Sequence, residues 1–345
     1  MKKHAIIPIF IPHKGCPNDC VFCNQKKITA RTKPLDKEGV IETIETYLST
    51  LLNRDLETIE IAFYGGSFTG IPLKEQKSYL SIAKSYKDKG LINKIHLSTR
   101  PDYIDEKILE HLKSYGVDII ELGVQSFDEE VLRLSNRGHS KEIVYESSRL
   151  IKNYDFELGL QLMIGLPGDT HEKSIASAKE VVKIGPSIAR LYPTVIIRDT
   201  ALYEMYARGD YVPLSEEEAI HTTKEMYLIL KKAGINVIRI GLKSSDFIDI
   251  KSDVGGGSFH PAFRQLVEAE IAKEELESQL IQLLANTNQE QENIRIQFFS
   301  NGPSFSNMVG NKKSNRIYFE KKYPHVRITF HVDHTLLNDV YLAKG

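Results

Sequence analysis

The chain of 345 residues has only three cysteines, and its 45 Lys and Arg nearly balance 46 Asp and Glu. Three is a small and odd number of cysteines, so a disulfide framework is not expected. A net charge of −1 gives no indication of a polyanionic partner. Any surface that binds nucleic acid therefore has to be a local patch of basic residues. With 41% hydrophobic and 26% charged residues, the composition excludes collagen-like, coiled-coil and largely disordered chains.

Long apolar runs are also missing, since no segment offers the ~20 residues that a membrane-spanning helix needs. The N-terminal run MKKHAIIPIFIP begins like a secretion signal, but Pro8 and Pro12 interrupt it and no small-residue cleavage site follows. A buried first strand explains the run better, so we expect a cytoplasmic protein with no membrane segment. Internal repeats and low-complexity tracts are absent from the sequence.

Short apolar or β-branched runs alternate with amphipathic stretches over the first 242 residues. The runs with strand character are residues 5–12, 58–64, 94–99, 118–125, 156–164, 188–196 and 236–240. Helix-like stretches between them predict right-handed βαβ units and a parallel sheet. The expected fold class is α/β, as a partial (β/α)6 barrel of the TIM type, rather than a full eightfold barrel.

The pattern changes after residue 242. Residues 255–258, GGGS, predict a loop that is either an interdomain hinge or an anion site before the helix that Pro261 opens. A strand, a basic helix and two more strands follow. The length also favours two domains. We predict a barrel of residues 1–242 and a small α+β domain of residues 243–345, which serves as an appendage for RNA or another substrate.

Unusual residues follow five successive predicted strands. The carboxyl ends of parallel strands share one edge of a barrel, where chemistry collects. The five loops contain residues 13–23, 65–70, 98–101, 125–126 and 165–168. Five such loops in order predict a functional site at this edge.

Cys16, Cys20 and Cys23 lie within eight residues, in the spacing CxxxCxxC. Three thiolates on one loop can bind three irons of a cubane cluster and leave the fourth iron to an exogenous ligand. The alternative is a structural zinc ion, with His13 completing a Cys₃His set. Phe22 favours the cluster, because it is placed to stack on a flat ring near the metal, for which a structural zinc site has no use.

This segment resembles the signature of the radical S-adenosylmethionine (SAM) superfamily. The resemblance implies a 4Fe–4S cluster on Cys16, Cys20 and Cys23, with SAM on the fourth iron and Phe22 against the adenine. One electron from the reduced cluster would cleave SAM, and the resulting 5′-deoxyadenosyl radical would abstract a substrate hydrogen. The electron donor would be of the flavodoxin or ferredoxin type.

The stretch GGSFTG follows the second predicted strand. Glycines allow a ligand to approach the backbone closely, and consecutive N–H groups can hold a carboxylate. From the residues alone, a tight turn explains the stretch equally well. The resemblance implies that Gly65, Gly66 and Ser67 contact the methionyl amine and carboxylate of SAM.

The segments ELGVQSF and LSNRGH resemble the oxygen-independent coproporphyrinogen oxidases and the Elongator catalytic subunit. The resemblance implies that Gln125 contacts the SAM ribose and Arg137 the methionyl carboxylate. Ser98 stands where the oxidases have a ribose-binding glutamate, which makes it a further ribose candidate. Gln161 stands where they have an aspartate. These two departures count against haem synthesis.

Residues 191–206, LYPTVIIRDTALYEMY, are similar to the corresponding segment of Elongator catalytic subunits and their stand-alone bacterial relatives. The likeness covers about residues 5–240 and implies radical modification of RNA, above all tRNA. Because no acetyl-CoA signature is present, acetyl-dependent carboxymethylation of wobble uridine is not expected. Tyr192 is our only suggestion for a catalytic residue, as a radical quencher.

Basic residues concentrate between residues 309 and 327, a segment that contains six Lys or Arg and a single Glu. A glycine-led basic loop before a helix faintly resembles a KH module, whose GxxG loop grips a nucleic-acid backbone, although the second glycine is missing. On this interpretation Lys312, Lys313 and Arg316 bind RNA. The alternative is an ordinary solvated helix.

Two other functions remain open at this point. One is a radical SAM enzyme that acts on a small molecule, as in porphyrin metabolism. The other is a zinc-stabilised RNA-binding protein without catalytic activity.

Overall fold

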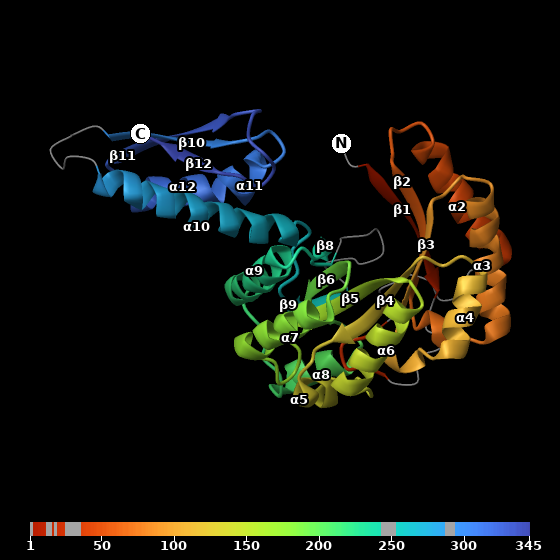
Figure 1. Ribbon diagram of the computed structural model, residues 1–345. Coiled ribbons are helices and arrows are strands. Elements are labelled where there is room, and N and C mark those ends of the chain that lie inside the picture. Colours follow the sequence, from red (N-terminus) through yellow and green to blue (C-terminus); the bar gives the residue numbers. More distant parts are fainter. Residues whose placement is uncertain (1–2, 12–15, 17–18, 25–35, 243–252, 287–293) are drawn as a thin grey trace. The chain divides into compact units, whose positions relative to one another are not determined.

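The computed structural model describes residues 3–11, 16, 19–24, 36–242, 253–286 and 294–345 (Figure 1). It divides into two compact units, which we describe separately. The first unit comprises Met1–Ala219 with Met226–Phe259, and the second comprises Ile220–Glu225 with His260–Gly345. The domain boundary expected after residue 242 stays a prediction.

The first unit is built on a seven-stranded sheet in the order β1-β2-β3-β4-β5-β6-β8. Its strands are β1 (His4–Ile11), β2 (Thr58–Gly65), β3 (Lys94–Thr99), β4 (Ile119–Gln125), β5 (Glu157–Ile164), β6 (Ile188–Pro193) and β8 (Asn236–Ile240). Every pairing in this sheet is parallel. The sheet forms a half-barrel, which confirms the expected α/β partial barrel.

Helices connect these strands and follow one another along the sheet (Figure 1). They are α2 (Lys37–Leu51), α3 (Leu73–Asp88), α4 (Glu106–Ser114), α5 (Glu129–Leu134), α6 (Lys141–Asn153), α7 (His171–Ile184), α8 (Ala201–Arg208) and α9 (Glu216–Lys232). Short 3₁₀ turns lie at Phe68–Gly70 and Pro101–Tyr103. Alternate strand residues such as Ile61, Leu97 and Leu122 are fully buried, as expected for the face that the helices cover.

Two predicted elements differ from the structure. The strand expected over residues 188–196 ends at Pro193, which has no backbone N–H to continue the ladder. The next strand, β7 (Val195–Ile197), instead pairs antiparallel with β9 (Val254–Gly257), so the expected loop at 255–258 is largely a strand. A Cβ on Gly255 would lie 2.6 Å from the ring of Tyr203, which explains a glycine there.

The second unit is a small α+β domain. It contains α10 (Phe263–Ala285), β10 (Ile294–Ser300), α11 (Phe305–Val309), a 3₁₀ turn (Asn311–Lys313), α12 (Ser314–Lys322), β11 (Val326–Val332) and β12 (Leu342–Lys344). Strand β10 pairs parallel with β11 and antiparallel with β12. Leu276, Leu280, Phe298 and Phe319 form its core. In the part of the chain that the structure describes, no helix has the length and hydrophobicity of a membrane span.

Candidate functional site

The three cysteines lie just after β1. Cys20 and Cys23 close a tight turn, in which the Cys23 amide donates to the Cys20 carbonyl at 2.9 Å. Cys20 is buried, Cys16 and Cys23 are partly exposed, and none of the three forms a disulfide. The spacing CxxC therefore brings the second and third cysteines to one turn. His13, the fourth ligand of the zinc alternative, lies outside the described residues.

Segments far along the chain hold this turn in place. The Val21 amide donates to the Ser135 carbonyl at 3.1 Å, and the Leu202 amide donates to the Val21 carbonyl at 2.8 Å. The Asn136 side chain donates to the Asp19 carbonyl at 3.0 Å. These contacts come from the loop after α5 and from α8, so the folded barrel fixes the cysteine turn.

Positive charge and N–H donors surround the sulfurs. Arg137 Nη1 lies 3.3 Å from Cys20 Sγ, and Nη2 of the same guanidinium donates to the Gly123 carbonyl. Burial raises the pKa of the Cys16 thiol, while a hydrogen bond from the Ser67 amide and the charges of Arg137 and Arg100 act in the opposite direction. Thiolates among cationic donors suit a soft, negatively charged metal cluster, so these residues fit a 4Fe–4S group.

Gly65 and Gly66 lie directly against the end of β1. The Gly66 amide donates to the Ile11 carbonyl at 3.1 Å. Gly65 has φ +119°, and a Cβ there would lie 2.3 Å from the same carbonyl oxygen, so only glycine fits. The Ser67 hydroxyl lies 2.7 Å from the Thr99 hydroxyl at the end of β3. The glycine stretch thus lies beside the strand that leads into the cysteines. The predicted contact of Gly65, Gly66 and Ser67 with SAM stays a prediction.

Gln125 and Ser98 lie at the carboxyl ends of neighbouring strands. Gln125 ends β4 after an irregularity in the register and is 5% exposed, with φ +72°. Its side-chain oxygen accepts from Gln161 Nε2 at 3.1 Å. A non-glycine residue with a positive φ at the end of a strand is often found at a ligand site. The Ser98 hydroxyl donates to Glu121 Oε1 at 3.1 Å. The roles of both residues toward SAM stay predictions.

The sequence interpretation missed a buried polar network in the sheet. Arg190 donates from Nε to Glu121 at 2.6 Å, from Nη2 to the Tyr64 hydroxyl at 2.5 Å and from Nη1 to the Tyr192 hydroxyl at 3.3 Å. Glu121 and Arg190 are 2% and 7% exposed. The sequence does contain a signal for this network, since Glu121 and Arg190 are charged residues within otherwise apolar predicted strands. The structure thus ties Tyr192 to this network, and its role as a radical quencher stays a prediction.

Nearby, Glu60 contacts two histidines. His96 Nδ1 lies 3.2 Å from one of its carboxylate oxygens and His4 Nε2 lies 3.1 Å from the other. Burial would raise the pKa of Glu60, but the hydrogen bonds from His4 and His96 outweigh it and lower the pKa to about 2. The inner face of the half-barrel is therefore polar and charged, in contrast to the face that packs against the helices.

Phe22 packs against the small apolar cluster of Ile196, Leu202 and Tyr211. Tyr211 also donates from its hydroxyl to the Gly165 carbonyl at 2.5 Å, which joins this cluster to the loop after β5. One side of the Phe22 ring is thus supported by side chains from β7, α8 and the segment after α8. This packing is compatible with the predicted adenine contact.

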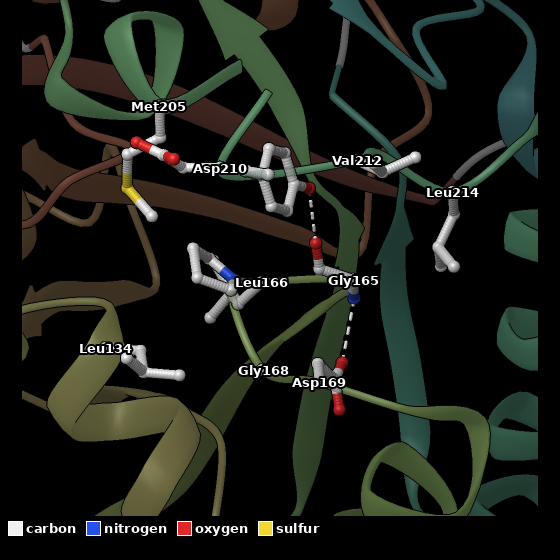
Figure 2. Close-up of a pocket in the computed structure, with 11 residues that line it drawn as sticks. Leu134, Gly165, Leu166, Gly168, Asp169, Met205, Asp210, Val212 and Leu214 are labelled. Atoms are coloured by element: carbon white, nitrogen blue, oxygen red, sulfur yellow. Dashed lines mark hydrogen bonds between the residues drawn. The ribbon is translucent and has the colours of Figure 1, made fainter. Parts of the chain in front are cut away.

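Figure 2 shows a pocket of about 250 Å³ where β5 ends. The loop of residues 165–169 and the segment after α8 that includes Asp210 and Val212 form its walls, and Leu134 and Met205 also line it. Asp169 accepts from the Gly165 amide at 2.8 Å and keeps the loop in shape. The sequence predicts the loop as part of the site, but it does not predict the wall after α8.

Comparison with known proteins now gives the class of protein. Residues 10–181 match the Radical SAM superfamily, and residues 186–273 match the family described as the Radical_SAM C-terminal domain. The chain therefore belongs to the radical SAM superfamily and is a radical SAM enzyme. Its cofactors are those of the superfamily, a 4Fe–4S cluster and SAM.

Two curated relatives have names that are more specific than the superfamily. The chain is 28% identical over 267 residues to the tRNA uridine(34) acetyltransferase of Methanocaldococcus infernus, covering 66% of this chain and 50% of that protein. It is 30% identical over 265 residues to Elongator complex protein 3 of Homo sapiens, covering 63% and 47%. The chain thus spans about half the length of these relatives. The predicted resemblance to the radical SAM and Elongator proteins is confirmed.

A solved structure supports the fold. The archaeal Methanocaldococcus infernus Elp3 with an N-terminal deletion superimposes with a TM-score of 0.63 at 24% identity, covering 80% of this chain and 64% of that chain. At this identity the likeness concerns the fold, and it agrees with the half-barrel described above.

Proposed function

We propose that this radical SAM enzyme modifies tRNA, and that Cys16, Cys20 and Cys23 hold its cluster. The observation that carries the proposal is the cysteine turn itself, with a guanidinium on one sulfur and the Gly65–Ser67 stretch beside it. The substrate class is suggested by the relatives, which are named for tRNA uridine(34) and for Elongator. A cytoplasmic location fits an RNA substrate.

A 4Fe–4S cluster held by Cys16, Cys20 and Cys23 would supply the electron for reductive cleavage of SAM, and so the radical for hydrogen abstraction from the substrate. The chain provides the binding site. Gly65 and Gly66 would let the methionyl group approach the backbone. Arg137 compensates negative charge beside Cys20, and its predicted contact with the methionyl carboxylate stays a prediction. Gln125 and Ser98 would contact the ribose, and Phe22 would support the adenine.

The loop before α12 in the second unit supports an RNA substrate. Gly310 has φ +84°, and a Cβ there would lie 2.3 Å from the Ser314 hydroxyl and 2.6 Å from the Asn315 amide. The next two lysines, Lys312 and Lys313, both adopt left-handed conformations, with φ +51° and +67°, and are exposed. Backbone strain of this kind persists only where surrounding structure enforces it.

Buried side chains anchor this lysine loop. The side-chain Nδ2 of Asn315 donates to the Ala269 carbonyl at 2.8 Å and to the Asn307 carbonyl at 3.1 Å. The two lysines are therefore presented on a fixed backbone. Arg316 instead pairs with Glu320 at 2.8 Å, so we expect it to contribute less than the lysines to phosphate binding.

Anaerobic reconstitution tests the chemistry. Protein loaded with iron and sulfide and reduced with dithionite or a reduced flavodoxin is expected to be brown and to release 5′-deoxyadenosine from SAM. A colourless protein that retains zinc and releases none would instead support the binding-protein alternative.

Changing Lys312, Lys313 and Arg316 to Ala is expected to weaken tRNA binding. For every phosphate that the variant no longer neutralises, the slope of log Kd against log salt should fall by roughly 0.7–0.9. Binding of bulk tRNA is measured by filter retention over a range of salt concentrations. A matched variant with three exposed lysines of the first unit changed to Ala, Lys37, Lys74 and Lys77, is the control. An unchanged slope in the first variant would remove the loop from the proposal.

A further inference from the structure

Arg100 is a buried guanidinium with no part in the SAM contacts proposed so far. It follows β3 directly and is 2% exposed, among the largest fully buried side chains. A buried charge is stable only when it is paired and hydrogen-bonded. Asp102 supplies the pairing, with Nε to Oδ1 and Nη2 to Oδ2 both at 2.9 Å. Burial lowers the pKa of Arg100, but the Asp102 carboxylate outweighs this and raises it, so the guanidinium stays charged.

One nitrogen of this guanidinium makes no hydrogen bond to the described residues. Nη2 also donates to the Arg137 carbonyl at 2.8 Å, whereas Nη1 is buried and has no hydrogen-bond partner among the described residues. An orphaned N–H in the interior is costly, and in a native protein it indicates a missing acceptor.

Arg100 is connected to two of the three cysteines through one residue each. Its amide donates to the Ser67 hydroxyl at 3.2 Å, and the Ser67 amide is hydrogen-bonded to Cys16. Its side chain donates to the carbonyl of Arg137, whose own Nη1 lies 3.3 Å from Cys20 Sγ. Cys20 and Cys16 are also the anionic groups that act on Arg100 after Asp102.

We propose that Arg100 raises the reduction potential of the cluster, with Nη1 as a donor toward its sulfur. The inference rests on the proposed function, because it requires the cluster on these cysteines. Reduction adds one negative charge to the cluster, so a fixed cation and an N–H donor stabilise the reduced form over the oxidised form. The incoming electron is supplied by the external donor.

The other acceptor for a buried guanidinium would be the methionyl carboxylate of SAM. A carboxylate is best bound by two parallel N–H groups of one guanidinium edge. Asp102 already occupies the edge formed by Nε and Nη2, and Nη2 is also engaged with Arg137. The single remaining nitrogen, Nη1, favours a sulfur acceptor.

The test is an EPR-monitored redox titration of the reconstituted cluster without SAM, in the wild type, Arg100→Gln and Arg100→Lys. In Arg100→Gln we expect the equilibrium constant for reduction to fall about tenfold, a shift of about 59 mV to more negative potential. Arg100→Lys keeps the positive charge but loses the planar guanidinium with its several N–H donors, so the reduction potential of this variant should shift less. Arg133→Gln, an exposed arginine of the same unit, is the control and should not shift.

Each outcome decides one claim. If Arg100→Gln does not fold, as judged by iron content and circular dichroism, the Arg100→Lys titration decides. Unchanged potentials in a variant with a full cluster overturn the inference, as does a loss of SAM affinity with an unchanged potential, which would assign Nη1 to SAM. A wild type that forms no cluster overturns the proposed function instead.

Discussion

We expect Cys20→Ser to remove the cluster and to reduce the release of 5′-deoxyadenosine to background. A serine oxygen is a poor substitute for thiolate on iron, and Cys20 is the most buried of the three cysteines and lies against Arg137. The measurement is iron and sulfide content after anaerobic reconstitution, together with 5′-deoxyadenosine release after reduction.

The fold itself should survive this change, because two backbone hydrogen bonds of Val21 hold the turn independently of the sulfur. The Val21 amide donates to the Ser135 carbonyl, and the Val21 carbonyl accepts from the Leu202 amide. Circular dichroism of the metal-free protein is the matched control and should be the same for both forms. Normal iron content in Cys20→Ser would show that this cysteine is not a ligand.

Arg190→Met is expected to lower the free energy of unfolding by about 3–5 kcal/mol. The substitution leaves the Glu121 carboxylate buried without its cation and removes a donor from the Tyr64 and Tyr192 hydroxyls. The measurement is guanidinium-induced unfolding, followed by far-UV circular dichroism.

A double variant separates the buried charge from the rest of the effect. Glu121→Gln combined with Arg190→Met leaves no unpaired ion at this pair, so it should recover much of the lost stability. If Arg190→Met alone costs less than about 1 kcal/mol, the value typical of an exposed pair, the network does not stabilise the sheet.

The architecture of the half-barrel could be predicted because its signal is local. Each strand is a short apolar run and each helix an amphipathic stretch, and their alternation allows few topologies. The break at Pro193 and the pairing of β7 with β9 depend on which segments meet in space. The sequence around Gly255 suggests a loop, because it does not show that the Tyr203 ring lies against this glycine.

The candidate site was partly predictable for the same reason. The spacing of Cys16, Cys20 and Cys23 lies within one short segment and predicts the metal ligands directly. Arg137 and Cys20 are 117 positions apart in the sequence, and no local sequence pattern predicts a contact between residues so far apart. The sequence places Arg100 in a strand-end loop. Only the folded chain shows that it is buried and that its Nη1 has no hydrogen-bond partner in the described part of the chain.

The central claim is that three protein thiolates leave one iron open for SAM. The most direct measurement is electron–nuclear double resonance on the reduced protein with SAM labelled with ¹⁵N at the methionyl amine and ¹⁷O at the carboxylate. We predict hyperfine coupling of both labels to the cluster. Bound SAM without such coupling, on a cluster whose four irons all have protein ligands, would contradict the claim.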